Sequence, residues 1–184
     1  MSTAAAATHT RTTWTIDPAH SLIEFAVRHL MITTVKGRFA GVEGTVQLDE
    51  ADPAFADVDV RIDAATIDTR EPQRDTHLRS ADFFDVERFP HITFTAKRPI
   101  AGRGGAFTLA GDLTVHGVTK PVVLAVNEEG RGKDPWGGER LGFSATTKIK
   151  RSEFGLTWNQ ALEAGGVLVG DEIKISLDLE LLKS

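Results

Sequence analysis

The stretch D17-PAHSLIEFAVRHLMITTVKGR-F39 decides the fold that we expect for this chain. Within it, Ile23, Phe25 and Val27 alternate with the residues between them, and this period of two predicts a half-buried strand over 21–29. The Asp17-Pro18 pair predicts a turn just before that strand. Phe25 and Val27 then face either a filled core or a hollow one, and the function of the protein depends on which.

Similar alternation recurs along the rest of the chain. It predicts further strands over 14–16, 58–62, 91–97, 107–115, 121–126, 141–149 and 173–181. Residues 71–80 are polar and carry Pro72 where a first helical turn tolerates it, so they predict a short helix. Many short strands without a strand–helix–strand rhythm are typical of an antiparallel sandwich or barrel.

The connecting segments refine this prediction. Three glycines within 35–48 predict bulges or a sharp bend in a strand, as strands of a closed barrel require. Residues 30–34 predict one helical turn or an irregular cover over a barrel end, and residues 127–140 predict a long polar loop. We therefore expect an all-β fold, an eight-stranded antiparallel lipocalin-like barrel with a short helical insert.

Length and composition exclude several classes of protein. The 184 residues suit one domain, and a net charge of −5 with scattered basic residues argues against a nucleic-acid surface. The nearest approach to a basic cluster is Lys148, Lys150 and Arg151. The absence of cysteine excludes a disulfide scaffold, thiol catalysis and cysteine-bound metal.

The first residues differ in character from the rest. Residues 1–13 have no basic start and only four consecutive alanines, too few for a signal peptide, so we expect a disordered tail followed by a barrel domain over 14–184. No apolar run reaches the length of a membrane span. These observations lead us to expect a cytoplasmic protein that does not span a membrane.

No catalytic motif is apparent in the sequence. It contains no nucleophile elbow, phosphate-binding loop or dinucleotide fingerprint, and its six histidines form no metal-binding pair, so we predict neither a cofactor nor a metal. The densest polar group is Asp75-Thr76-His77 with Arg74 and Arg79. They are either a solvated helix face or a polar rim that orients the head group of a ligand.

Several sequence motifs together resemble the YceI-like family. They are W-T-I-D-P-A-H-S at 14–21, F-A-V-R-H-L-M at 25–31, V-K-G-R-F at 35–39, R-D-T-H-L-R-S-A-D-F-F-D at 74–85, F-P-H-I-T-F at 89–94, G-D-L-T-V-H-G-V-T-K-P-V at 111–122 and R-S-E-F-G-L at 151–156. Each motif is weak alone, but their order and combination are specific. The resemblance covers nearly everything except the first thirteen residues.

The resemblance implies an elongated barrel with a long apolar tunnel for an isoprenoid or fatty chain, a homodimer, and no catalytic residue. Many such proteins are periplasmic with a leader peptide, which we do not find here. In this chain the tunnel would be lined by Phe25, Val27, Phe39, Phe83, Phe84, Phe94, Phe143, Phe154 and Trp158. The head group of the ligand would lie near His29, Arg74, Asp75 and His77.

Three hypotheses remain open from the sequence. The first is non-catalytic binding, storage or transport of a long-chain ligand: a polyisoprenoid, an isoprenoid quinone or a fatty-acid-like molecule. The second is an enzyme acting on a lipid head group, with His20, Asp75 and His77 as acid–base candidates. The third is a filled barrel that serves as a dimerisation or scaffold module, with residues 127–140 as the place for a partner.

Overall fold

The computed structural model describes residues 10–49, 56–97, 101–103 and 105–184. In this part of the chain one α-helix, α1, spans Pro72–Arg79, and three short 3-10 helices span Pro18–His20 (η1), Ala64–Thr66 (η2) and Arg151–Phe154 (η3). The strands are β1 (Arg11–Ile16), β2 (Leu22–His29), β3 (Thr33–Phe39), β4 (Val42–Asp49), β5 (Ala56–Asp63), β6 (Ile67–Asp68), β7 (His91–Ala96), β8 (Ala101–Arg103), β9 (Ala106–Val115), β10 (Val118–Lys133), β11 (Glu139–Lys150) and β12 (Val169–Lys183).

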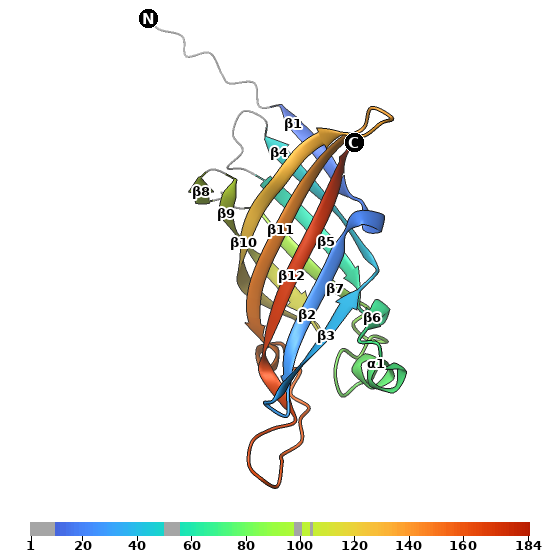
Figure 1. Cartoon of the computed structure of the whole chain (residues 1–184), viewed down its shortest axis with the longest axis vertical. Helices are drawn as coiled ribbons and strands as arrows, with labels where there is room; N and C mark the ends of the chain where they lie inside the picture. Colours follow the sequence, from blue (N-terminus) through green and yellow to red (C-terminus); the bar gives the residue numbers. More distant parts are fainter. Residues whose placement is uncertain (1–9, 50–55, 98–100, 104) are drawn as a thin grey trace, which may run out of the picture.

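Eight of these strands pair in a closed antiparallel ring. The order is β1–β4–β5–β7–β9–β10–β11–β12, and β12 pairs back with β1 over Trp14–Ile16 and Leu181–Lys183. The strands run obliquely around an elongated barrel, with α1 beside one end and the C-terminus at the other (Figure 1). The predicted eight-stranded barrel with a short helical insert is confirmed.

Each of the first three walls of the barrel consists of two consecutive strands with a break between them. β12 pairs with β2 over its first half and with β1 at its end, so β1 and β2 act as one wall that η1 interrupts. β3 and β4 form the next wall in the same way, and β5 and β6 the third. Among the described residues β6 pairs only with β3, so the ring is open between β6 and β7 at the α1 end. The insert that contains α1 lies there.

The turn between β2 and β3 differs from its prediction. Leu30 and Met31 take left-handed backbone conformations, with φ of 52° and 61°, and β3 already begins at Thr33. Such a tight turn leaves no room for a helical turn. Met31 and Ile32 are 53% and 72% exposed, so the segment does not cover the barrel end as a buried lid would.

Two further sequence predictions need correction. Residues 127–140 do not form a long loop, because β10 continues to Lys133 and β11 starts at Glu139. Their polar side chains are exposed on both faces, which hides the strand periodicity. Residues 11–13 belong to β1 rather than to the predicted tail, and residues 1–9 of that tail lie outside the described residues.

The glycines of β3 and β4 have a different role from the one predicted. The pairing of β2 with β3 has no register shift, and neither has that of β4 with β5. Gly37 lies opposite Phe25, and a Cβ there would stand 2.3 Å from the Cζ of the Phe25 ring. The glycine is therefore required for close approach of an aromatic ring, and only Gly41 marks a break, between β3 and β4.

Inward-facing apolar side chains form one continuous core along the barrel. Trp14, Leu141 and Leu181 are at most 1% exposed and pack where the first and last strands of the ring meet. In the part of the chain that the structure describes, no helix has the length and apolarity needed to cross a membrane.

The contact between Gly37 and the Phe25 ring can be tested by Gly37→Ala. The added methyl group would force the ring or the backbone to move, so we expect unfolding to become easier by about 1–3 kcal/mol. The measurement is urea unfolding followed by circular dichroism. Gly132→Ala is the matched control, because Gly132 also lies in a strand but a Cβ there meets nothing within 4 Å. Equal losses in both variants would contradict this explanation.

Candidate functional site

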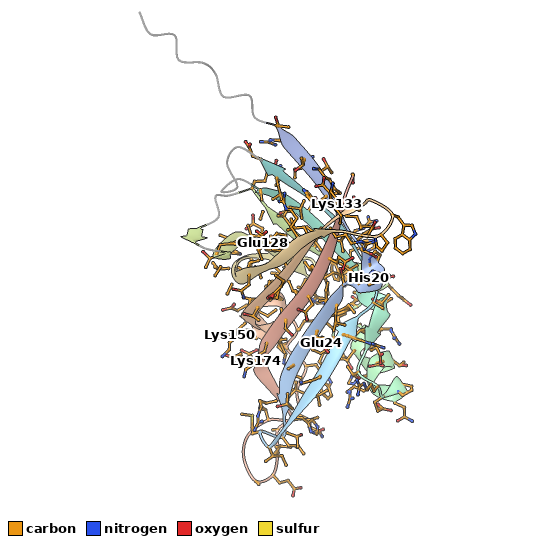
Figure 2. The ribbon with its side chains drawn as sticks, turned by 45° about the horizontal axis from the view of Figure 1, so that its top comes forward. His20, Glu24, Glu128, Lys133, Lys150 and Lys174 are labelled. Atoms are coloured by element: carbon orange, nitrogen blue, oxygen red, sulfur yellow. The ribbon has the colours of Figure 1, made fainter. Side chains whose placement is uncertain are left out.

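The barrel encloses a cavity of about 260 Å³. Every strand of the closed ring contributes side chains to its wall, and the insert adds Leu78, Phe83 and Phe84. The wall residues are apolar except for Glu24, Thr147 and Arg151. Glu24 lies on the outward set of β2, and its side chain projects from the outer surface together with those of Lys150 and Lys174 (Figure 2). The interior is therefore hollow and almost wholly hydrocarbon.

Most residues predicted to line a tunnel belong to this wall. The structure places Phe25, Val27, Phe39, Phe83, Phe84, Phe94, Phe143 and Phe154 in it. Phe25 and Phe39 have ring centroids 5.7 Å apart, and Phe84 of the insert meets Phe39 edge-on at 5.8 Å. These contacts bring the insert against the opening between β6 and β7. Their role in binding a ligand stays a prediction.

Trp158 is not among the wall residues. Its ring packs against His77 at 4.8 Å and against Phe83 at 5.2 Å, and His77 and Phe83 lie 5.1 Å apart. Trp158 belongs to the connection between η3 and β12, while His77 and Phe83 belong to the insert. This aromatic cluster therefore joins two segments that lie far apart in sequence at the α1 end of the barrel.

The residues predicted to contact a head group lie outside the cavity wall. The buried Asp75 carboxylate accepts hydrogen bonds from Thr69, from its amide at 2.9 Å and its hydroxyl at 2.5 Å. Arg74 donates to the hydroxyl and carbonyl of Thr69, both at 2.8 Å. These bonds fasten the start of α1 to the end of β6, which is a structural role.

The two histidines predicted to contact the head group, His29 and His77, also lie outside the cavity wall. His77 places Nε2 2.8 Å from Oδ2 of Asp82 within the insert. His29 ends β2 and pairs with Thr33 of β3 and with Val169 of β12. His20, the third acid–base candidate, lies in η1 on the outer surface (Figure 2). The structure does not bring His20, Asp75 and His77 together as an acid–base site.

Arg151 is a buried, charged wall residue that the sequence predictions did not select. It is only 6% exposed, and its guanidinium donates to the carbonyl oxygens of Leu156, Trp158, Val169 and Gly170. The sequence did contain a signal for its inward position. Arg151 continues the alternation of the inward-facing residues of β11, which include Ala145, Thr147 and Ile149. Its place beside two exposed lysines concealed that signal.

A second polar cluster joins four segments on the outer surface. Arg140 of β11 donates to Asp17 before η1 at 3.2 Å, to Asp134 of the β10–β11 turn at 3.0 Å, and to Glu180 of β12. Asp17, His20 and Glu180 have ligand atoms within 4.8 Å of one another. Because the Arg140 guanidinium already provides the counter-charge, the group acts as an ion cluster that ties η1 and the turn to β12.

The protonation of this cluster is coupled. His20 Nδ1 lies 2.8 Å from Asp17 Oδ2, and this hydrogen bond lowers the pKa of Asp17 below its ordinary 3.8. The same bond raises the pKa of His20 above its ordinary 6.5, with the charges of Asp17 and Glu180 acting in the same direction. The carboxylates of Glu180, Asp134 and Asp17 raise the pKa of Arg140.

Comparison with known families matches most of the chain. A family model described as YceI-like domain matches residues 14–181. The protein YceI of Salmonella newport is 41% identical over 138 residues, which cover 75% of this chain and 72% of that protein. The family-model match spans the barrel from β1 to β12.

Solved structures have the same architecture. The YCEI protein of Campylobacter jejuni superposes with a TM-score of 0.72 at 33% identity, over 85% of this chain and 90% of that one. A polyisoprenoid binding domain from Saccharophagus degradans superposes with a TM-score of 0.68 at 15% identity, over 93% and 98%. At that identity the second likeness shows the fold alone.

The hydrogen bond between His20 and Asp17 predicts that the stability of the fold depends on pH. A raised pKa in the folded state means that protonated His20 stabilises the fold below pH 6.5, and that this contribution is lost as the pH rises through the raised value. We expect wild type to exceed His20→Gln in urea midpoint at pH 6 and to approach it at pH 9. In an Asp17→Asn background the difference between the two pH values should largely disappear. A wild-type advantage that stays constant with pH would contradict the assignment.

Proposed function

The chain belongs to the YceI-like family, and we propose that its barrel binds one long apolar molecule: a polyisoprenoid, an isoprenoid quinone or a fatty-acid-like chain. The observation that carries the proposal is the hollow interior, whose wall is hydrocarbon over nearly all of its area. A polar ligand would find no hydrogen-bonding partners on such a wall. The polyisoprenoid binding named for the Saccharophagus degradans domain agrees in kind.

Magnitudes favour a long chain over a short one. Burying a methylene group contributes about 0.8 kcal/mol, whereas association costs roughly 4–15 kcal/mol before a flexible chain is ordered. A chain of about five carbons therefore gains too little from its tail. A chain of about fifteen carbons gains about 12 kcal/mol gross and can bind.

We propose binding without chemistry, for storage or transport of the ligand. In its support, the three titratable side chains considered for acid–base work lie apart, and Asp75 and His77 have partners within or beside the insert. A homodimer and a cytoplasmic location stay predictions, which light scattering and cell fractionation check. Native mass spectrometry followed by organic extraction is the direct test of the ligand. Recovery of no lipid, with no binding of any long-chain probe, would overturn the proposal.

The apolar wall of the cavity predicts how affinity depends on the chain length of the ligand. In a series of saturated fatty acids, each added methylene should tighten binding roughly fourfold, as about 0.8 kcal/mol implies, until the cavity is full. Calorimetric titration measures this dependence. Affinity that is flat across the series would mean that the chain stays outside the barrel.

Blocking the cavity tests the same proposal from the protein side. Ala145 is 5% exposed and lines the wall in the middle of β11, so Ala145→Phe should fill part of the space and reduce the longest ligand that binds. Ala125→Phe is the matched control, because Ala125 is exposed on neighbouring β10 and is absent from the wall. We expect at least tenfold weaker binding of the longest ligand for Ala145→Phe and no change for Ala125→Phe. Equal binding by both variants would place the ligand elsewhere.

A further inference from the structure

Apolar side chains are exposed where the turn between β2 and β3 projects at the α1 end. Met31 is 53% exposed and Ile32 is 72% exposed. The amide of Leu30 donates to the carbonyl of Leu168 at 2.9 Å, which fastens the turn to the connection before β12, where Val167 is also exposed. Figure 1 shows both segments at the lower extreme of the molecule. We call Met31, Ile32 and Val167 the apolar tip.

The backbone of the turn is held in one shape. The guanidinium of Arg28 donates to the carbonyl of Met31 at 2.8 Å and to the hydroxyl of Thr34 at 3.3 Å. The amide of Ile32 donates to the carbonyl of His29 at 3.1 Å. The turn therefore presents its apolar side chains to solvent as a fixed surface. Exposed apolar groups that gather at one place mark a site of interaction.

Basic side chains gather on the outer surface beside the tip. They are exposed and belong to the outward set of four neighbouring strands: Lys148 and Lys150 of β11, Lys174 of β12, Arg28 of β2 and Lys36 of β3. Lys148 lies directly opposite Lys174, and only Ala26 separates Lys174 from Lys36 along the same row. Figure 2 shows Lys150 and Lys174 on the outer surface. We call this set the basic face.

The carboxylates near the basic face neutralise only part of it. Glu172 forms an ion pair with Lys148 at 3.2 Å, and Asp171 accepts hydrogen bonds from η3. Glu24 lies on β2, further from the turn than Arg28, and Glu163 lies in the connection before β12. Among the described residues no carboxylate pairs with the other three lysines of the set.

This local charge is opposite to that of the whole chain. The chain has 26 acidic and 21 basic residues, yet residues 25–42 contain no aspartate or glutamate. The strands that meet at the turn are thus positive where most of the protein surface is negative. A partner that carries negative charge is attracted to this face and repelled by much of the rest.

We propose that the α1 end of the barrel docks on an anionic lipid bilayer. The apolar tip enters the interfacial region, and the basic face lies against the head groups. Binding of this kind grows with the apolar area buried and with the attraction between basic side chains and anionic lipids. Docking needs no ligand in the cavity, so it goes beyond the proposed function and does not depend on it.

The combination of the two surfaces favours a bilayer over a nucleic acid. Phosphate groups of a nucleic acid would engage the lysines but would leave the apolar tip in water. A bilayer accommodates both. Docking would also bring the opening between β6 and β7 towards the membrane, where molecules with long apolar chains reside. This consequence alone rests on the proposed function.

Sedimentation of the full chain with vesicles tests the docking. Vesicles of phosphatidylcholine are compared with vesicles of phosphatidylcholine and phosphatidylglycerol. We expect at least tenfold tighter binding to the anionic vesicles, and weaker binding as salt is added. The same binding to both lipid compositions, or no binding to either, would overturn the proposal and leave the proposed function intact.

Two pairs of variants separate the apolar and the basic contributions. Met31→Ser combined with Ile32→Ser should weaken binding at least tenfold, whereas Trp136→Ser, at an 87% exposed side chain of the β10–β11 turn, should not change it. Lys174→Glu should also weaken binding at least tenfold, whereas Lys133→Glu, which changes the net charge equally at the opposite end, should have little effect (Figure 2). Equal effects within each pair would contradict the assigned face.

A fluorescent label reports which end touches the lipid. The chain has no cysteine, so Ile32→Cys and Trp136→Cys can each be labelled at one position with the environment-sensitive dye NBD. We expect anionic vesicles to shift the emission of the label at 32 to the blue and to leave the label at 136 unchanged. The opposite result would overturn the orientation. Equally tight binding of duplex DNA that is unaffected in the Met31→Ser, Ile32→Ser variant would replace docking with a general affinity for anions.

Discussion

The barrel depends on one short seam, the pairing of Trp14–Ile16 with Leu181–Lys183 that joins the first strand to the last. Closure removes the free sheet edges and directs every second side chain towards a common interior. The seam is reinforced on both sides. Trp14 is fully buried beneath the cations of Arg131 and Lys183, and the Arg140 cluster ties η1 and the β10–β11 turn to β12 close by.

The hollow interior follows from the size and placement of the side chains that face inward. Eight strands leave a space that large side chains can just fill, or that can hold one small ligand. Here Ala56, Ala145 and several valines occupy wall positions between the phenylalanines, and the ring of Phe25 lies against Gly37 on the neighbouring strand rather than across the cavity. Aromatic rings that lie along the wall leave the centre open.

The two ends of the barrel are built in different ways. At the α1 end the ring is incomplete, and Phe84, the cluster of His77, Phe83 and Trp158, and the bonds of Arg151 close the gap with side chains. At the opposite end, backbone pairing at the seam completes the ring. The one buried cation of the described wall, Arg151, lies at the α1 end, where backbone carbonyl oxygens surround its guanidinium.

The sequence by itself determined the period of two, the closed all-β class, the short helix and most of the aromatic wall, because alternation and helix-start signals depend on neighbouring residues. It also predicted that Phe25 and Val27 face inward. Tertiary structure alone decided that the interior is hollow, that Arg74 and Asp75 brace Thr69 instead of facing the cavity, and that Arg151 is buried among four carbonyls. These features depend on segments far apart in the chain, and no local pattern reports whether the space between facing side chains is filled.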